Sequence, residues 1–252
     1  MTGPAERFDL SGRVALVTGG SRGLGREIVR AFAAAGADVV IASRKLDACA
    51  ELAAEVTRTT GRRALAHACH VGRWEELEDL LDAAYGEFGR LDVLVNNAGL
   101  SPVFDRPADV TEDLWDKVLA VNLKGPFRLC ALAGPRMAEA GGGSIINVSS
   151  VAAVRPRPHF IPYAAAKAGL NAITVAFAFA FGPSVRVNCI MAGPFLTDIS
   201  KAWRAETTDT LAHLALGRAG DPSEIVGVAL YLAGDASSFT TGAVIPVDGG
   251  TP

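Results

Sequence analysis

Short apolar runs alternate along this chain with longer segments in which apolar and polar positions recur at helical spacing. The short runs are rich in β-branched residues and are predicted to be buried strands: Val14–Val17, Val39–Ile41, Val93–Val95, Ile145–Val148 and Val185–Ile190. The longer segments are predicted to be helices: Gly25–Ala35, Glu75–Phe88 and Leu114–Met137. This alternation is typical of a parallel sheet. We therefore expect an α/β fold, with one doubly wound parallel sheet flanked by helices on both faces, as a single domain over residues 1–252.

Composition and charge narrow the range of partners. Half of the 252 residues are hydrophobic and the net charge is −3, so neither nucleic acid nor an anionic membrane is an expected partner. The first residues, MTGPAERFDLSG, contain no apolar signal-peptide core. The longest apolar stretch, Ala172–Phe181, is shorter than a membrane span. We expect a soluble, cytoplasmic protein.

The cysteines and histidines give no framework for a disulfide or a metal site. The cysteines are widely spaced and include no C-x-x-C pair, so we expect reduced and mostly buried thiols. The histidines show no H-E-x-x-H-type spacing, so no bound metal is expected. The residues concerned are Cys49, Cys69, Cys130 and Cys189, and His67, His70, His159 and His213.

A glycine-rich turn, Thr18 to Gly25, lies between the first expected strand and the first expected helix. Glycines permit positive φ angles and let a phosphate approach the backbone, and the following helix presents free N–H groups to an anion. With three residues between Gly19 and Gly23, the turn departs from the common G-x-G-x-x-G pattern. The alternative is a tight connection without a ligand, but the position after the first strand favours a nucleotide.

The sequence resembles the short-chain dehydrogenase/reductase family over nearly its whole length. TGGSRGLG is similar to the family's TGxxxGxG turn, and residues 96–99 to its NNAG motif. Asn122 stands in the VNLKG context of the family's active-site asparagine, and Ser150 with Tyr163-x-x-x-Lys167 matches its catalytic set. The chain also ends in the family's VDGG motif, at residues 247–250. The resemblance implies a Rossmann-like fold and an oxidoreductase that interconverts a carbonyl compound and an alcohol with a nicotinamide coenzyme.

The same resemblance implies the residues that contact the coenzyme. Two of them depart from the usual family residue: His70 replaces an aspartate that contacts adenine, and Ala192 replaces the proline before Gly193. A neutral imidazole still offers a hydrogen bond, although His70 is equally consistent with a strand end of no special role. The implied contacts are Gly19, Ser21, Arg22, Gly23, Leu24, Gly25, Ser43, Arg44, His70, Val71, Asn97, Ala98, Gly99, Tyr163, Lys167, Gly193, Phe195 and Thr197.

The end of the second strand indicates NADP(H) rather than NAD(H). A site for NAD usually places a carboxylate there, which accepts a hydrogen bond from the ribose 2′-hydroxyl. In this chain the position is held by Ser43, Arg44 follows it, and Arg22 lies in the glycine turn. A guanidinium group binds a phosphate through two hydrogen bonds. The alternative is that Arg44 and Lys45 only begin a solvated helix.

Tyr163 and Lys167 have the chemistry of a tuned general acid. A tyrosine has a pKa of about 10, which a neighbouring cation lowers. The two residues are four apart, so they share one face of a helix that Pro162 opens. By resemblance, Ser150 polarises the substrate oxygen and Asn122 supports a proton path. The alternative is a non-catalytic NADP(H)-binding redox sensor, which has no need of all four residues.

The sequence indicates several possible classes of substrate and does not choose among them. The segment 195–216 is the expected substrate lid, and the substrate is a 3-oxoacyl thioester, a sugar or polyol, a ring ketone or a xenobiotic carbonyl compound. The helix that continues from Tyr163 contains Ala176–Phe181, with alternating phenylalanines. Being apolar on several faces, it is predicted to be buried, partly against a partner subunit. By resemblance we expect a homotetramer.

Overall fold

A computed structural model of the chain describes residue 3 and residues 5–197 and 211–252. In this part of the chain seven strands form one sheet in the order β3-β2-β1-β4-β5-β6-β7, and every neighbouring pair is parallel. The strands are β1 Val14–Thr18, β2 Asp38–Ser43, β3 Ala64–Ala68, β4 Val93–Asn96, β5 Gly143–Ser150, β6 Val185–Ala192 and β7 Val244–Val247. The helices are α1 Gly23–Ala34, α2 Leu46–Thr60, α3 Glu76–Phe88, α4 Glu112–Leu119, α5 Gly125–Glu139, α6 Ile161–Phe181 and α8 Val226–Ala233.

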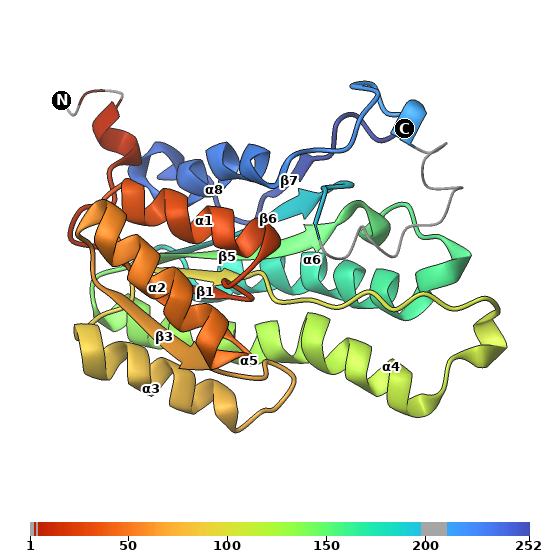
Figure 1. Cartoon of the computed structure of the whole chain (residues 1–252), viewed down its shortest axis with the longest axis horizontal. Helices are drawn as coiled ribbons and strands as arrows, with labels where there is room; N and C mark the ends of the chain where they lie inside the picture. The colour runs from red at the N-terminus through yellow and green to blue at the C-terminus, as the bar shows by residue number, and fades with distance from the viewer. Residues whose placement is uncertain (1–2, 4, 198–210) are drawn as a thin grey trace.

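The helices form a layer on each face of the sheet (Figure 1). Helices α1, α2 and α8 share one hydrophobic core with one face of the sheet, and α3, α5 and α6 share a second core with the other face. Successive strand residues alternate between the cores: Val17 and Val39 lie in the first, and Leu16 and Val40 in the second. The expected doubly wound parallel sheet is therefore confirmed.

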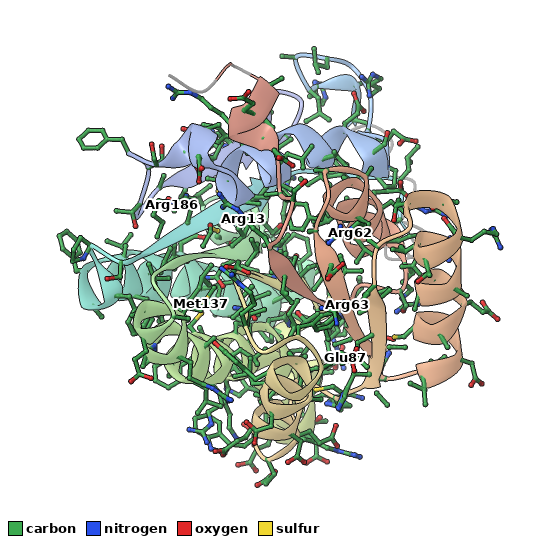
Figure 2. The ribbon with its side chains drawn as sticks, turned by 90° about the vertical axis from the view of Figure 1, so that its left-hand side faces the viewer. Arg13, Arg62, Arg63, Glu87, Met137 and Arg186 are labelled. Carbon is green, nitrogen blue, oxygen red and sulfur yellow. The ribbon has the colours of Figure 1, made fainter. Side chains whose placement is uncertain are left out.

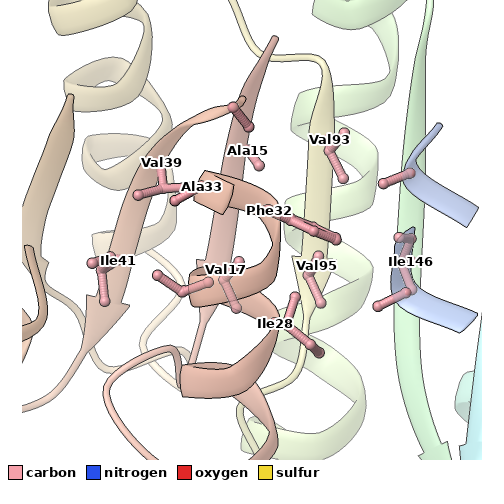
Figure 3. Close-up of a cluster of buried hydrophobic side chains, with 14 of the residues drawn as sticks. Ala15, Val17, Ile28, Phe32, Ala33, Val39, Ile41, Val93, Val95 and Ile146 are labelled. Atoms are coloured by element: carbon pink, nitrogen blue, oxygen red, sulfur yellow. The ribbon is translucent and has the colours of Figure 1, made fainter. Parts of the chain in front are cut away.

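Helix α1 shows how the sequence spacing builds one of these layers. Ile28 and Phe32 are four residues apart and fully buried, so they lie on the same side of the helix. Figure 3 shows both side chains directed toward Val17 and Val95 of neighbouring strands. Burying an isoleucine or phenylalanine side chain stabilises a fold by about 1.5–3 kcal/mol. This packing holds the start of α1 against the end of β1.

The order of the strands places a crevice at the carboxyl ends of β1 and β4. The chain runs outward from β1 to β2 and β3, and then returns to place β4 on the other side of β1. The connections on the two sides of this point lie on opposite faces of the sheet, which leaves a gap where α/β proteins bind ligands. The glycine-rich turn after β1 and the NNAG motif after β4 meet there.

At the amino ends of the strands, charged side chains form hydrogen bonds with backbone carbonyl groups. Arg13 and Arg186 lie close together there (Figure 2). Arg186 donates to the carbonyl oxygens of Leu232 and Gly234 at 3.0 and 3.2 Å, and Arg13 donates to that of Ala233 at 3.1 Å. These carbonyls end helix α8 and have no partner within the helix. The guanidinium groups of Arg13 and Arg186 therefore have a structural role, because they satisfy the carbonyl oxygens at the end of α8.

The predicted helix Leu114–Met137 is continuous in the structure but contains a π-helical turn. Residues Ala120–Lys124 form this turn between α4 and α5, and Asn122 lies in it. A π-helical turn inserts one extra residue into the helical register and occurs frequently at functional sites. The other predicted helices and strands are confirmed to within two residues at each end.

Helix α6, with the turn before it, is longer than its apolar end suggested. The helix Pro158–Phe181 has 24 residues and is apolar enough, by length and composition alone, to cross a membrane. The apolar stretch Ala172–Phe181 that the sequence shows is only the C-terminal part of this longer helix. In this fold the helix packs along β5: Lys167 donates to the carbonyl oxygen of Val148 at 2.7 Å, and Thr174 accepts from the Asn147 amide at 2.9 Å.

All four cysteines are free and buried, as expected. Burial raises the pKa of the Cys69 and Cys130 thiols to about 12, so both are protonated and unreactive near neutral pH. Among the described residues no three histidine, cysteine, aspartate or glutamate side chains gather as metal ligands.

Candidate active site

The glycine-rich turn is shaped by positive φ angles and close backbone contacts. Gly19 and Gly23 have φ angles of +63° and +53°, which favour glycine. A Cβ atom at Gly19 would lie 2.9 Å from the Cα of Ala98, and one at Gly25 would collide with the Gly19 carbonyl oxygen. Helix α1 starts at Gly23, and the residue before it provides no side-chain cap for the first N–H groups. The turn is thus a cradle with a free helix N-terminus, suited to a phosphate.

The NNAG loop is fastened to this turn by hydrogen bonds. The Thr18 hydroxyl accepts from the backbone N–H groups of Asn97 and Ala98 at 3.0 and 3.2 Å. The Asn97 amide donates to the carbonyl oxygens of Thr18 and Gly19 at 2.9 and 3.2 Å. The two motifs therefore form one rigid unit, although they are about eighty residues apart in the chain.

One cavity of about 1090 Å³ joins the sequence-predicted residues at the carboxyl edge of the sheet. Its size is at the upper end of the range for small-molecule sites. All of the predicted coenzyme contacts line it except Gly25, which lies beneath the turn, and so do Ser150, Tyr163 and Lys167. Asn122 does not line it. Residues 198–210 of the predicted lid lie outside the described residues, whereas Phe195, Thr197, His213 and Leu214 line the cavity.

The end of the cavity nearest β2 is polar and positively charged. Ser21 donates to the Ser43 hydroxyl at 3.0 Å, which joins the glycine turn to the end of β2. Arg22, Arg26, Arg44 and Lys45 surround this point, and the described residues lining the whole cavity include no aspartate or glutamate. Sequence reasoning missed Arg26 because its place one turn into α1 is not part of any motif.

His70 lies at the same end of the cavity, after β3. Its Nδ1 atom accepts from the backbone N–H of Gly72 at 3.1 Å. A neutral imidazole that accepts at Nδ1 carries its proton on Nε2. His70 therefore presents a hydrogen-bond donor, where the usual aspartate would present an acceptor.

Ser150, Tyr163 and Lys167 meet at the other end of the cavity. Ser150 ends β5, and Tyr163 and Lys167 lie on the first turns of α6, which Pro162 helps to start. The Lys167 ammonium lies 5.7 Å from the centre of the Tyr163 ring. Burial raises the pKa of Tyr163, and the Ser150 side chain opposes this effect. The phenol is therefore protonated near neutral pH and ready to donate.

Burial has the opposite effect on Lys167, because it disfavours the charged form of an amine. Only 4% of this residue is exposed, and burial lowers its pKa to about 8. The Cys189 side chain acts in the other direction. The ammonium form is held in place by the Val148 carbonyl oxygen, and it remains the main form at pH 7.

Asn122 does not line the cavity itself, but it holds the backbone of Leu100, which does. Its amide nitrogen donates to the carbonyl oxygens of Leu100 and Val118, both at 2.9 Å, and its carbonyl oxygen accepts from the Leu100 N–H at 3.2 Å. The π-helical turn aims this side chain at the loop after the NNAG motif. A Cβ atom at Gly99 would lie 2.9 Å from the Asn122 oxygen and 3.7 Å from the Lys167 nitrogen, so the three residues adjoin.

The segment after β6 closes the cavity over the glycine turn. Gly193 donates to the Val247 carbonyl oxygen at 2.9 Å, and a Cβ atom there would collide with Asp248. Thr197 lies against Gly23, because a Cβ atom there would be 3.4 Å from its methyl group. The Phe195 ring packs against Gly220 in the core. Ala192, which stands where the family usually has a proline, ends β6 and pairs with Val247.

Further residues line the cavity beyond those that motifs indicated. Arg155 and Arg157 come from the loop between β5 and α6, and Thr251 and Pro252 come from the other end of the chain. His159, four residues before Tyr163, lines the cavity as well. No signal in the sequence marks Arg155 or Arg157, since no motif contains them.

Comparisons with known proteins agree with this geometry. A family model described as enoyl-(acyl carrier protein) reductase matches residues 19–252. The human protein named dehydrogenase/reductase SDR family member 4 is 38% identical over all of this chain and 91% of its own length. A solved structure of a putative short-chain alcohol dehydrogenase from Sinorhizobium meliloti 1021 has a TM-score of 0.92 and 42% identity, covering 96% of this chain and 97% of its own. A 7α-hydroxysteroid dehydrogenase, solved with NADH and 7-oxo glycochenodeoxycholic acid, has a TM-score of 0.94 and 32% identity, covering 99% and 98%.

Proposed function

The chain belongs to the short-chain dehydrogenase/reductase family of oxidoreductases that act on alcohols and carbonyl compounds, and we propose that it is an NADP(H)-dependent member that uses Tyr163 as its general acid. It interconverts a ketone or aldehyde and the corresponding alcohol. The observation that carries this proposal is the meeting of Ser150, Tyr163 and Lys167 at one end of a cavity whose other end is the glycine cradle.

The residues present fit a dinucleotide with an additional phosphate. The cradle of Gly19 and Gly23 would be filled by any side chain, and a phosphate fits it instead. Because a relative in the family holds NADH, family membership alone does not choose between the coenzymes. The absence of a carboxylate in the described lining, together with Arg22 and Arg44 beside Ser43, favours NADP(H).

In the proposed reaction the bound coenzyme supplies a hydride to the carbonyl carbon, or takes one in the reverse direction. Tyr163 donates its proton to the carbonyl oxygen as the carbon–oxygen double bond becomes single. The Ser150 hydroxyl holds that oxygen, and the Lys167 ammonium stabilises the tyrosinate that remains. In the reverse direction the tyrosinate acts as the base.

Tyr163→Phe tests the mechanism, because it removes only the donated proton. We expect kcat to fall by about 10²- to 10⁴-fold, with the affinity for NADPH, measured by fluorescence titration, almost unchanged. A carbonyl panel of 3-oxoacyl thioesters, keto-sugars, ring ketones and diketones supplies the substrate. If the variant keeps comparable turnover, the mechanism is wrong. If the unmodified protein binds NADPH tightly but reduces nothing in the panel, the redox-sensor alternative gains support.

Arg44→Ala tests the choice of coenzyme. Arg44 is exposed and makes no hydrogen bond or ion pair with the rest of the described chain, so its loss should not disturb the fold. We expect the affinity for NADPH to fall by about 10- to 100-fold, as for a hydrogen-bonded charge, and that for NADH to change little. Arg58→Ala, on the exposed face of α2, is the control. Equal losses for both coenzymes would contradict the 2′-phosphate assignment.

We also propose that the protein assembles as a homotetramer. The support is an exposed apolar surface on α6, where Phe179 is 85% exposed and Val175 is 40% exposed. The cytoplasmic location and the substrate class stay predictions.

A further inference from the structure

The loop between Ser150 and Tyr163 adds positive charge to the substrate end of the cavity. Arg155 follows Ser150 by five residues and His159 precedes Tyr163 by four, and both line the cavity together with Arg157. This loop is separated from the cations beside Ser43, which lie at the coenzyme end. Arg155 and Arg157 line the same cavity as the proposed reacting groups Ser150, Tyr163 and Lys167.

These polar groups have no partners in the part of the chain that the structure describes. The Arg155 and Arg157 side chains make no hydrogen bond, ion pair or ring contact with it. The Nδ1 atom of His159 is buried and also lacks a hydrogen-bond partner there. Arg155 and Arg157 are both exposed, so their guanidinium groups are open to the solvent in the cavity and an anionic ligand can reach them.

The backbone of this loop is held at three points. The Ser150 hydroxyl accepts from the Ala152 N–H at 3.2 Å, and Arg155 donates its N–H to the Val151 carbonyl oxygen at 2.8 Å. The N–H of Phe104 donates to the carbonyl oxygen of His159 at 3.3 Å. The two arginines therefore extend from an anchored loop, and their guanidinium groups need only rotamer changes to meet a ligand.

We propose that Arg155 and Arg157, with His159, form an oxyanion subsite that selects substrates bearing a carboxylate or phosphate group. The proposal rests on the proposed function, since it names the substrate class of that site. A guanidinium group binds either anion through paired hydrogen bonds. The anionic group remains unchanged in the reaction: the carbonyl carbon gains a hydride, its oxygen gains the Tyr163 proton, and an oxo acid becomes a hydroxy acid.

Binding of inert probes tests the subsite without turnover. Benzoate, phenyl phosphate and benzamide are titrated into the NADP⁺-saturated protein by calorimetry. We expect at least one of the two anions to bind about 10- to 100-fold more tightly than benzamide, and that preference to disappear in Arg155→Gln/Arg157→Gln. Benzoate and phenyl phosphate then distinguish a carboxylate site from a phosphate site. The Arg155→Lys/Arg157→Lys variant should keep part of the preference, and Arg58→Gln should keep all of it.

Four outcomes test this inference separately from the proposed function. Equal binding of anions and benzamide by the unmodified protein overturns the subsite, whatever the enzyme reduces. An anion preference that survives Arg155→Gln/Arg157→Gln also overturns it. A preference that survives Tyr163→Phe but not the arginine substitutions supports the subsite. If the anion preference depends on the two arginines but the unmodified protein reduces neither keto acids nor their methyl esters, the subsite stands and the proposed function fails.

Discussion

Lys167 places an ammonium group in the interior of the protein, where 4% of the residue is exposed. Its pKa is lowered from 10.5 to about 8 because burial disfavours the charge. The unfolded chain retains the lysine proton up to about pH 10.5, whereas the folded chain loses it above about pH 8. Between these values the unfolded state binds more protons, so this residue makes the free energy of unfolding rise with pH. The buried ammonium group of Lys167 therefore destabilises the fold most at neutral pH and below, where it stays protonated.

Lys167→Met should reveal how much the buried lysine charge lowers the free energy of unfolding. We expect turnover to be lost, while the stability of the variant relative to the unmodified protein is greatest near pH 7 and declines by about 1.4 kcal/mol per pH unit between pH 8 and 10. Urea denaturation at several pH values measures the difference. Lys117→Met, at an exposed position of α4, should show no such slope. A constant difference for Lys167→Met would mean that the lysine pKa is not lowered.

The π-helical turn between α4 and α5 connects a helix to the wall of the site. Asn122 forms three hydrogen bonds from this turn, two of them to the backbone of Leu100. Val71 packs at the same place, since a Cβ atom at Gly125 would collide with its carbonyl oxygen. The shift in helical register thus directs an amide side chain toward the loop that follows Asn97–Gly99. We infer that Asn122 acts as a positioning residue.

Asn122→Ala separates positioning from general stability. Removing the amide leaves the Leu100 N–H and carbonyl without these partners, so we expect the free energy of unfolding to fall by about 1–3 kcal/mol. We also expect faster amide exchange at Leu100 and a lower kcat. Thr111→Ala removes the cap at the start of α4 and should cost about 0.5–2 kcal/mol, with kcat unchanged. Equal kcat in both variants would show that the contact serves only the fold.

The sequence predicted those elements that have strong periodicity and those residues that lie in compact motifs. Buried strands such as Val93–Val95 were recognisable because they are continuous apolar runs. The sequence does not predict the bounds of strand β3, because ALAHA contains no β-branched residue. In the structure this strand is only partly buried. The π-helical turn leaves no mark in a pattern of apolar positions. No motif contains Arg155 or Arg157, because the role that we propose for them depends on the folding of a loop.

At the scale of the whole molecule, the phenylalanines of α6 divide between two environments. Phe177 and Phe181 are four residues apart and stack with ring centres 5.1 Å apart. Phe177 continues this stack to Phe127 of α5 at 5.5 Å. Phe179 lies between them in sequence and therefore points away from this cluster, with 85% of it exposed. The alternating phenylalanines thus belong to a helix, on which Phe177 and Phe181 pack against α5 and each other while Phe179 is exposed.

An exposed phenylalanine on an apolar helix is costly in water unless another surface covers it. Val175, 40% exposed, lies one turn before Phe179 and extends the same surface. If this surface joins two subunits about a two-fold axis, each Phe179 contacts the same patch of its partner. Phe179→Glu would then place two carboxylates close together in a desolvated contact, which like-charge repulsion and burial both oppose.

We expect Phe179→Glu to reduce the oligomer to a smaller species, measured by size-exclusion chromatography with light scattering, while the circular dichroism of the subunit is retained. Phe8→Glu changes a phenylalanine that is 41% exposed on the turn Ala5–Phe8 and should leave the mass unchanged. Because the α6 residues Tyr163 and Lys167 lie at the opposite end of this helix, loss of the contact should lower thermal stability more than kcat. An unchanged mass for Phe179→Glu would exclude this surface as a subunit contact.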